Sequence, residues 1–88
     1  MGLAIKTHSL STAPQLGQLL KAARKRRKLT QAQVASRLGL SQNRVSYLEL
    51  HADEISVRQL IAWVATVGLE LQLGDRDLSA ATTPEAEW

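Results

Sequence analysis

The segment SQNRVSYLEL, residues 41–50, contains polar side chains of the types that hydrogen bond to the edges of DNA bases. If the segment is a helix, Val45 and Leu48 lie on its buried side, because residues three apart share a face. At about 100° per residue, the side chains that point the opposite way are those of Gln42, Asn43, Ser46 and Tyr47. Gln or Asn can bind adenine through two hydrogen bonds, Ser can donate or accept one, and Tyr can contact a thymine methyl group or a phosphate. These four residues are the candidate base contacts; the alternative is an ordinary solvated surface.

Positive charge near this segment suits binding to phosphates. On a helix, the Lys residues of KAARKRRK, residues 21–28, project away from an apolar stripe, and Arg26 and Arg27 flank that stripe. A solvated face is the usual explanation of such a run, but beside a base-reading helix its cations would neutralise phosphates. Each contact would steepen the dependence of log affinity on log salt concentration by about 0.9. The candidate phosphate contacts are Lys28, Arg27, Arg44 and Ser41.

Catalytic and metal sites are not indicated by the remaining polar residues. His8 lies in the irregular N-terminal segment and His51 in a loop, and the sequence has no cysteine and no pair of histidines four residues apart. It also lacks a Gly-rich phosphate cradle, and its hydroxyl groups lack an evident base. We therefore expect no enzymatic activity, cofactor or metal, and we interpret both histidines as surface residues.

Four segments have the start signals of helices. The capping-box spacing, Ser or Thr followed three residues later by Gln, occurs at Thr12 and Gln15, Thr30 and Gln33, and Ser56 and Gln59. Ser41 is a predicted N-cap, and Pro14 falls in a first helical turn, where its missing N–H does little harm. The sequence predicts helices over about 13–27, 31–38, 42–50 and 57–67.

The two central helices have the spacing of a helix-turn-helix motif. Ala35 allows two helices to cross closely, and Gly39 can adopt a positive φ where the first helix stops. Val34, Val45 and Leu48 anchor both helices in one core. A turn of three or four residues that contains Gly joins the helices of this motif.

On the stretch RKLTQAQVASRLGLSQNRVSYLE, the chain resembles the XRE/Cro family of helix-turn-helix proteins, from about residue 16 to residue 67. The resemblance implies a mainly α, lambda-repressor-like bundle of four helices, with a structural ion pair between Arg24 and Glu49. It also implies that Gln31 binds phosphate at the start of the second helix, where free N–H groups and the helix dipole favour an anion. After Glu49 the chain departs from the family pattern, because LHADE stands where a glycine commonly follows.

The stretch GLELQLGDRD, residues 68–77, alternates leucines with polar residues, the period of a half-buried β-strand. A strand needs a neighbour for its backbone groups, and helix-turn-helix proteins usually bind as dimers to half-sites roughly 34 Å apart. We therefore predict that residues 69–73 pair antiparallel with the same strand of a second copy. The competing partner is the N-terminal LAIKT of the same chain. The predicted dimerisation residues are Leu69, Leu71, Leu73 and Trp63, although a plain core position for Trp63 is equally consistent with its place on the fourth helix.

Length and charge bound the organisation of the chain. Its 88 residues predict one small domain with a thin core. Residues 1–50 carry nine Lys or Arg against the single Glu49, whereas residues 51–88 carry two Arg against seven acidic residues. This asymmetry indicates a polyanionic partner at one end and a different partner, or none, at the other. Without cysteines or a long apolar run, we expect a cytoplasmic protein. The predicted divisions are a flexible segment at 1–12, a helix-turn-helix domain at 13–74 and a disordered acidic tail at 75–88.

A helix-turn-helix domain, a VGLELQL strand and an acidic tail that ends in Trp88 together resemble the HipB-type antitoxins. This resemblance implies a homodimer with an intersubunit β-lid, a HipA-type serine/threonine kinase toxin as partner, and repression from palindromic operators in a bacterial cytoplasm. Trp88 would bind an apolar pocket on the toxin, since a buried Trp is a common binding hot spot. Two alternatives stay open: a stand-alone repressor without a toxin, and a protein-interaction or coactivator module that does not read DNA.

Overall fold

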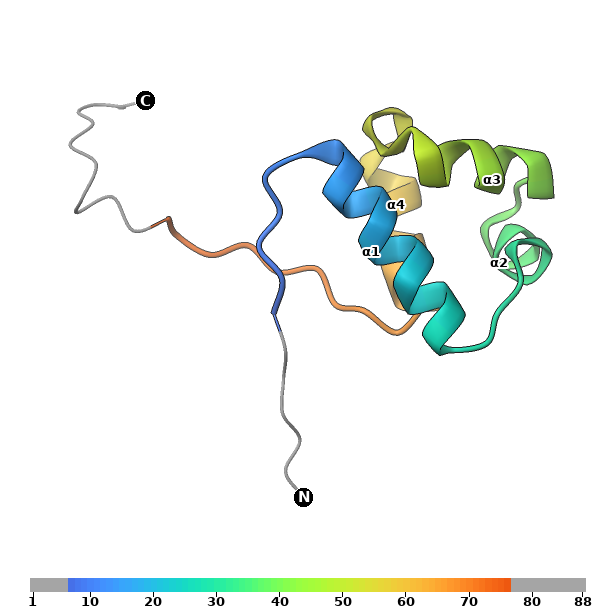
Figure 1. Cartoon of the computed structure of the whole chain (residues 1–88), viewed down its shortest axis with the longest axis horizontal. Helices are drawn as coiled ribbons and strands as arrows, with labels where there is room; N and C mark the ends of the chain where they lie inside the picture. Colours follow the sequence, from blue (N-terminus) through green and yellow to red (C-terminus); the bar gives the residue numbers. More distant parts are fainter. Residues whose placement is uncertain (1–6, 77–88) are drawn as a thin grey trace, which may run out of the picture.

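The computed structural model describes residues 7–76 and contains the four predicted helices (Figure 1). They are α1 (Ala13–Arg26), α2 (Gln31–Leu38), α3 (Gln42–Leu50) and α4 (Val57–Thr66), with a short 3₁₀ turn, η1 (Ala52–Glu54), between α3 and α4. The first and the last helix each end one residue earlier than predicted. Trp88, most of the acidic tail and most of LAIKT lie outside the described residues.

Each helix begins at its predicted cap, which is why the predicted starts agree with the structure. In α2, Gln33 N donates to Thr30 Oγ1 over 3.0 Å and Thr30 N donates to Gln33 Oε1 over 2.8 Å, a complete capping box. The same reciprocal pair forms at the starts of α1 and α4. Ser41 Oγ accepts from the backbone N–H of Arg44 over 3.0 Å at the start of α3. The cap hydrogen bonds therefore fix locally where each helix begins.

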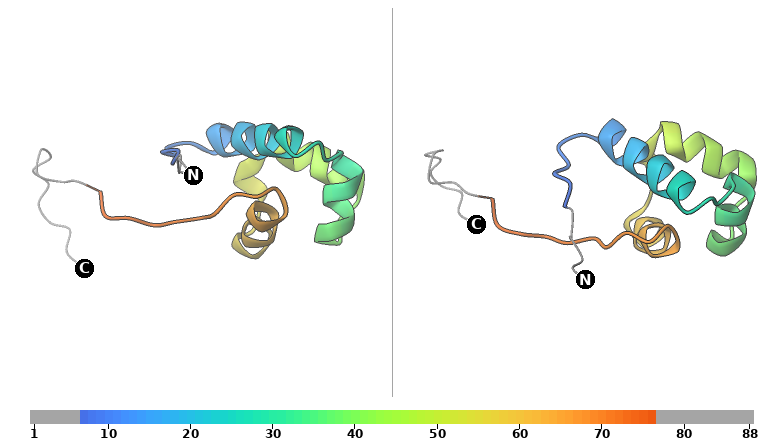
Figure 2. Two further views of the ribbon diagram at one scale, coloured as in Figure 1. Left: turned by 90° about the horizontal axis from the view of Figure 1, so that it is seen from below. Right: turned by 60° about the horizontal axis from the view of Figure 1, so that its bottom comes forward.

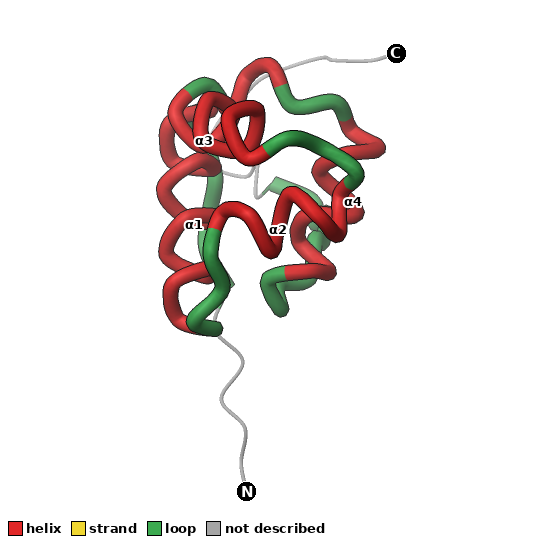
Figure 3. Tube along the Cα trace, turned by 90° about the vertical axis from the view of Figure 1, so that its right-hand side faces the viewer, coloured by secondary structure: helices red, strands yellow, loops and turns green. Residues whose placement is uncertain are grey.

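The helix-turn-helix pair, α2 and α3, occupies one side of the bundle (Figure 3). Gly39 ends α2 with φ 71°, a left-handed conformation that glycine adopts without steric cost. In the bundle α2 packs against both α3 and α4, and α1 packs against α3 and η1. The positive φ of Gly39 confirms the predicted turn of the motif.

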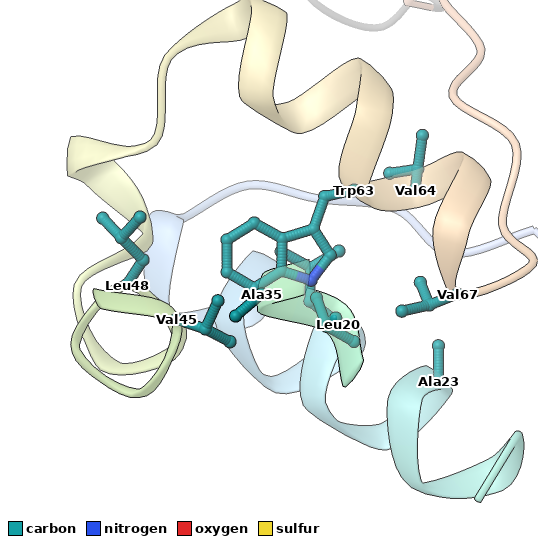
Figure 4. Close-up of a cluster of buried hydrophobic side chains, with 9 residues drawn as sticks. Leu20, Ala23, Ala35, Val45, Leu48, Trp63, Val64 and Val67 are labelled. Atoms are coloured by element: carbon teal, nitrogen blue, oxygen red, sulfur yellow. The ribbon is translucent and has the colours of Figure 1, made fainter. Parts of the chain in front are cut away.

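Trp63 is the largest buried side chain of the core, at 0% exposure. Figure 4 shows its indole ring reaching from α4 toward Leu20, Ala35 and Val45, which belong to α1, α2 and α3. The structure thus supports the core interpretation of Trp63, and the interpretation in which it extends a dimer surface is wrong. The indole N–H has no hydrogen-bond partner in the described part of the chain, a cost of about 1–3 kcal/mol. Burying the ring outweighs this cost, at roughly 25 cal/mol per Å² over some 150–250 Å².

The chain after α4 is extended and leaves the bundle on the side away from α2 and α3 (Figure 2). Gly68 turns the chain with φ 81°, and Leu69 N donates to Val64 O over 2.7 Å, so Leu69 packs against the core. Leu71 and Leu73 are 43% and 98% exposed. Within residues 7–76 no strand forms, because the extended segment has no neighbouring strand in a single chain. Pairing with a second copy stays a prediction.

α1 and the end of α3 approach each other closely at the turn that follows Glu49. At Gly17 of α1, an added Cβ would collide with the main-chain carbonyl of Glu49, and it would also lie next to the Cβ of Ala52. Ala52 is 6% exposed and begins η1. Where the helix-turn-helix family commonly has a glycine after Glu49, this chain forms a 3₁₀ turn. Ala52, the small first residue of that turn, packs against α1.

Candidate nucleic-acid interface

The outward side of α3 carries the polar residues that were predicted to face DNA. Val45 and Leu48 are fully buried, and Gln42, Asn43 and Tyr47 are exposed. Ser46 is half-buried at the flank of this surface. The structure thus brings three of the four predicted base contacts onto the solvent side of one helix, with Ser46 at the edge of that surface. Arg44 is exposed beside them.

A buried ion pair joins α1 to α3. Arg24 Nε donates to Glu49 Oε2 over 2.7 Å, and Arg24 Nη2 donates to Glu49 Oε1 over 3.2 Å. Arg24 Nη1 also donates to the carbonyl oxygen of Leu29 over 3.0 Å. Arg24 and Glu49 are only 7% and 6% exposed, so both charges depend on these partners for their solvation. The expected pair is present, and its fork geometry fixes the end of α3 against α1.

Gln31 extends this network to the first residue of α2. Its Nε2 donates to Glu49 Oε1 over 3.1 Å, which sets the orientation of the side-chain amide. An amide nitrogen has two N–H groups, so one remains for a ligand. The backbone N–H groups of Gln31 and Ala32 have no acceptor among the described residues. This arrangement suits an anion at the start of α2.

The cations of the basic run differ in what they contact. Lys25, Arg26 and Lys28 are exposed, and Lys28 adopts φ 57° in the link between α1 and α2. Arg27 differs, because its guanidinium lies against Gly68, at the C-terminal end of α4. Cations are favoured at such helix ends. Arg27, a predicted phosphate contact, therefore lies against the turn that follows α4.

Tyr47 makes contacts that the sequence did not predict. Its hydroxyl donates to Glu54 Oε2 of η1 over 2.6 Å, and its ring stacks on that of His51 with centroids 4.2 Å apart and planes at 25°. The guanidinium carbon of Arg44 lies 5.3 Å from the centre of the same ring. The hydrogen bond to Glu54 is the main cause of a raised pKa for Tyr47, and desolvation and the negative charge of Glu54 act in the same direction. His51, interpreted as a plain surface histidine, is thus part of a stacked group.

Leu50 is a further exposed residue that the sequence-based search missed. Its side chain is 71% exposed, and its spacing from Asn43 and Tyr47 places the three residues on one face of α3. A count of helical positions would have found it. An exposed leucine at this place can contact a thymine methyl group or an apolar partner.

Residues 7–76 contain neither a metal-ligand cluster nor a membrane-spanning helix. No group of three His, Cys, Asp or Glu side chains there is arranged to hold a metal ion. None of the helices in that range is both long enough and apolar enough to cross a membrane.

Comparisons with known proteins agree with this geometry. A chain in the solved HipA-HipB-O2-O3 complex has the same fold, with a TM-score of 0.70 and 22% sequence identity. The match covers 78% of the present chain and 97% of that chain. A search of curated proteins finds no match. The family model of the helix-turn-helix domain matches residues 15–71, which include α1 from its third residue onward and all of α2, α3, η1 and α4. The chain therefore belongs to the helix-turn-helix domain family.

Proposed function

We propose that the protein is a transcriptional repressor that places α3 in the major groove of DNA. The observation that supports this most strongly is the exposed polar face of Gln42, Asn43 and Tyr47, held in place by the buried pair of Arg24 and Glu49. An α-helix fits the major groove, and Gln or Asn side chains can pair with adenine there.

The same pose brings phosphate ligands to the rim of the groove. Gln31 and the free N–H groups at the start of α2 hold one phosphate, and Ser41, Arg44 and Lys28 bind others. Arg27 joins them only if it leaves Gly68. Because these contacts release counterions, affinity falls steeply with salt.

The functional unit is a homodimer on a palindromic operator. One helix contacts few base pairs, and a two-fold pair of α3 helices matches half-sites about one DNA turn apart. Leu71 and Leu73 are exposed on an extended segment whose backbone lacks a neighbouring strand, and antiparallel pairing with a second copy covers both features.

A HipA-type kinase toxin is the proposed second partner, which makes the protein an antitoxin in the bacterial cytoplasm. The fold similarity to a chain of a HipA-HipB-O2-O3 complex supports this assignment. Val57 and Ile61, one turn apart on α4, are 71% and 56% exposed and offer an apolar surface to another protein. Trp88, outside the described residues, is the proposed toxin anchor.

The DNA-reading step is tested by selecting a preferred duplex from random DNA with the natural protein. Gln42→Ala with Asn43→Ala should then reduce the preference for that duplex by about 1–3 kcal/mol for each bidentate hydrogen-bonded pair with a base that the substitutions remove. The matched control is Gln18→Ala, which removes an exposed glutamine from α1. An unchanged sequence preference in the double variant contradicts the assignment of α3 and favours the protein-interaction module.

The toxin partnership is tested separately by comparing the full chain with one that ends at Thr83 in a pull-down from lysate. Capture of a kinase that weakens on truncation supports the antitoxin and the role of Trp88. Equal capture by both chains removes only the role of Trp88, and capture of no protein favours the stand-alone repressor.

A further inference from the structure

Tyr47 lies on the outward face of α3, and its hydroxyl is already hydrogen-bonded within the protein. The side chain is 39% exposed, and its hydroxyl donates to the carboxylate of Glu54 over 2.6 Å. This distance is in the range of charge-assisted O–H···O⁻ hydrogen bonds, which are roughly twice as strong as neutral ones. A direct hydrogen bond from the hydroxyl to DNA would first have to break this one.

The Tyr47 ring also has two neighbours in the same part of the chain. His51, one turn after Tyr47, stacks at 4.2 Å, and the guanidinium carbon of Arg44, one turn before it, lies 5.3 Å from the ring centre. The two side chains approach the ring from opposite ends of the helix. Because the hydroxyl is bonded to Glu54, the part of Tyr47 that is left to contact DNA is the exposed carbon of its ring, an apolar surface.

We propose that Tyr47 contacts DNA through the exposed carbon of its ring, against a thymine methyl group, while its hydroxyl stays bonded to Glu54. Glu54 is then a positioning residue: it contacts no base, but it holds the Tyr47 ring, and the Arg44 guanidinium beside the ring, in the binding orientation. A side chain that is ordered before binding loses less conformational entropy in the complex. The inference deepens the proposed function and rests on it.

The alternative is that Tyr47 releases Glu54 and donates its hydroxyl to DNA. The two mechanisms predict opposite signs for one substitution. If Glu54 positions the ring, Glu54→Ala weakens recognition. If Glu54 competes with DNA for the hydroxyl, Glu54→Ala strengthens recognition.

The measured quantity is the preference, defined as the Kd for random duplex divided by the Kd for the duplex selected by the natural protein. Glu54→Ala should lower it by about three- to tenfold, the range expected when one side chain must be ordered on binding. Tyr47→Phe, which breaks the same hydrogen bond, should cause a similar loss. The double variant should lose no more than either single variant.

Two variants separate positioning from charge. Asp53→Ala removes a neighbouring carboxylate of the same 3₁₀ turn that does not bond Tyr47, so it should tighten binding to both duplexes and leave the preference unchanged. Glu54→Gln removes the charge and keeps an acceptor for the hydroxyl, so it should retain most of the preference. Thermal unfolding of each variant checks that the fold is intact; all the substituted residues are exposed.

The thymine contact has its own readout, because uracil differs from thymine by one methyl group. Replacing the contacted thymine by uracil should weaken binding by about fourfold for the natural protein, the effect of one buried methyl. The same replacement should have no effect on Tyr47→Ala.

The outcomes that overturn the inference are distinct from those that overturn the proposed function. A raised preference in Glu54→Ala together with a lowered one in Tyr47→Phe shows a direct hydroxyl contact. If no thymine-to-uracil replacement in the selected duplex weakens binding by the natural protein more than binding by Tyr47→Ala, the ring contact is excluded. In both cases a loss of preference in the Gln42→Ala and Asn43→Ala variant leaves the proposed function standing. A natural protein that selects no sequence overturns both.

Discussion

The buried ion pair of Arg24 and Glu49 should affect the stability of the fold. Glu49→Ala should destabilise the fold by about 3–5 kcal/mol, because it leaves the guanidinium of Arg24 buried without its partner. Urea unfolding measures the change. The control is the double replacement of Arg24 and Glu49 by Met, which removes both charges and should cost much less than the single variant. A loss below about 1 kcal/mol for Glu49→Ala would show that water reaches Arg24.

Tyr47 can be titrated directly because it is the only tyrosine in the chain. Its pKa is raised above the ordinary 10.0, chiefly by the hydrogen bond to Glu54. A raised pKa favours the protonated folded form, so this bond contributes stability below about pH 10 that is lost as pH rises through the folded pKa. Phenolate absorbance should therefore develop at higher pH in the natural protein than in Glu54→Ala. Identical titration curves would show that the hydrogen bond is absent in solution.

At the scale of residues, the predictions were right where the partner follows from a local pattern or a recognised family. The capping boxes depend on a three-residue spacing, and the pair of Arg24 and Glu49 was expected from the helix-turn-helix resemblance. The bond between Tyr47 and Glu54 was not predictable in this way. Glu54 lies beyond the end of α3, and only the geometry of η1 brings its carboxylate back to the helix.

Gly17 determines how closely α1 can approach the end of α3. Gly17→Ala gains about 1 kcal/mol of helix propensity but drives a Cβ into the main-chain carbonyl of Glu49. Overpacking of this kind costs about 1–3 kcal/mol, and a backbone atom cannot move aside as a flexible side chain can. We expect net destabilisation by thermal unfolding. Gly74→Ala is the control, since nothing lies within 4 Å of its added Cβ. A stabilised Gly17→Ala would mean that α1 shifts freely.

At the scale of elements, the helices were predictable to within one residue at their ends because caps and Gly39 mark their limits. The extended segment was not settled, because alternation of Leu69, Leu71 and Leu73 predicts a strand but does not say what it pairs with. Within one chain its backbone finds no neighbouring strand among the described residues.

The exposed leucines of that segment predict the oligomeric state of the protein. If the proposed dimer forms, replacing Leu71 and Leu73 by Ser should shift the protein to monomer in sedimentation at tens of micromolar, because it removes apolar area from the proposed pairing of residues 69–73 between two copies. Val57→Ser is the control, because it changes an exposed aliphatic residue on α4 that lies outside residues 69–73. A natural protein that already sediments as a monomer would contradict the paired strand.

The complete burial of Trp63 within one chain has a consequence for the order of assembly. A core that closes without a partner lets each copy fold as a unimolecular reaction, so the refolding rate after dilution from denaturant should not change with protein concentration. In the proposed dimer, association would then follow as a second-order step between folded molecules. Subunits of two differently tagged preparations would exchange at the rate of dissociation, without passing through the unfolded state.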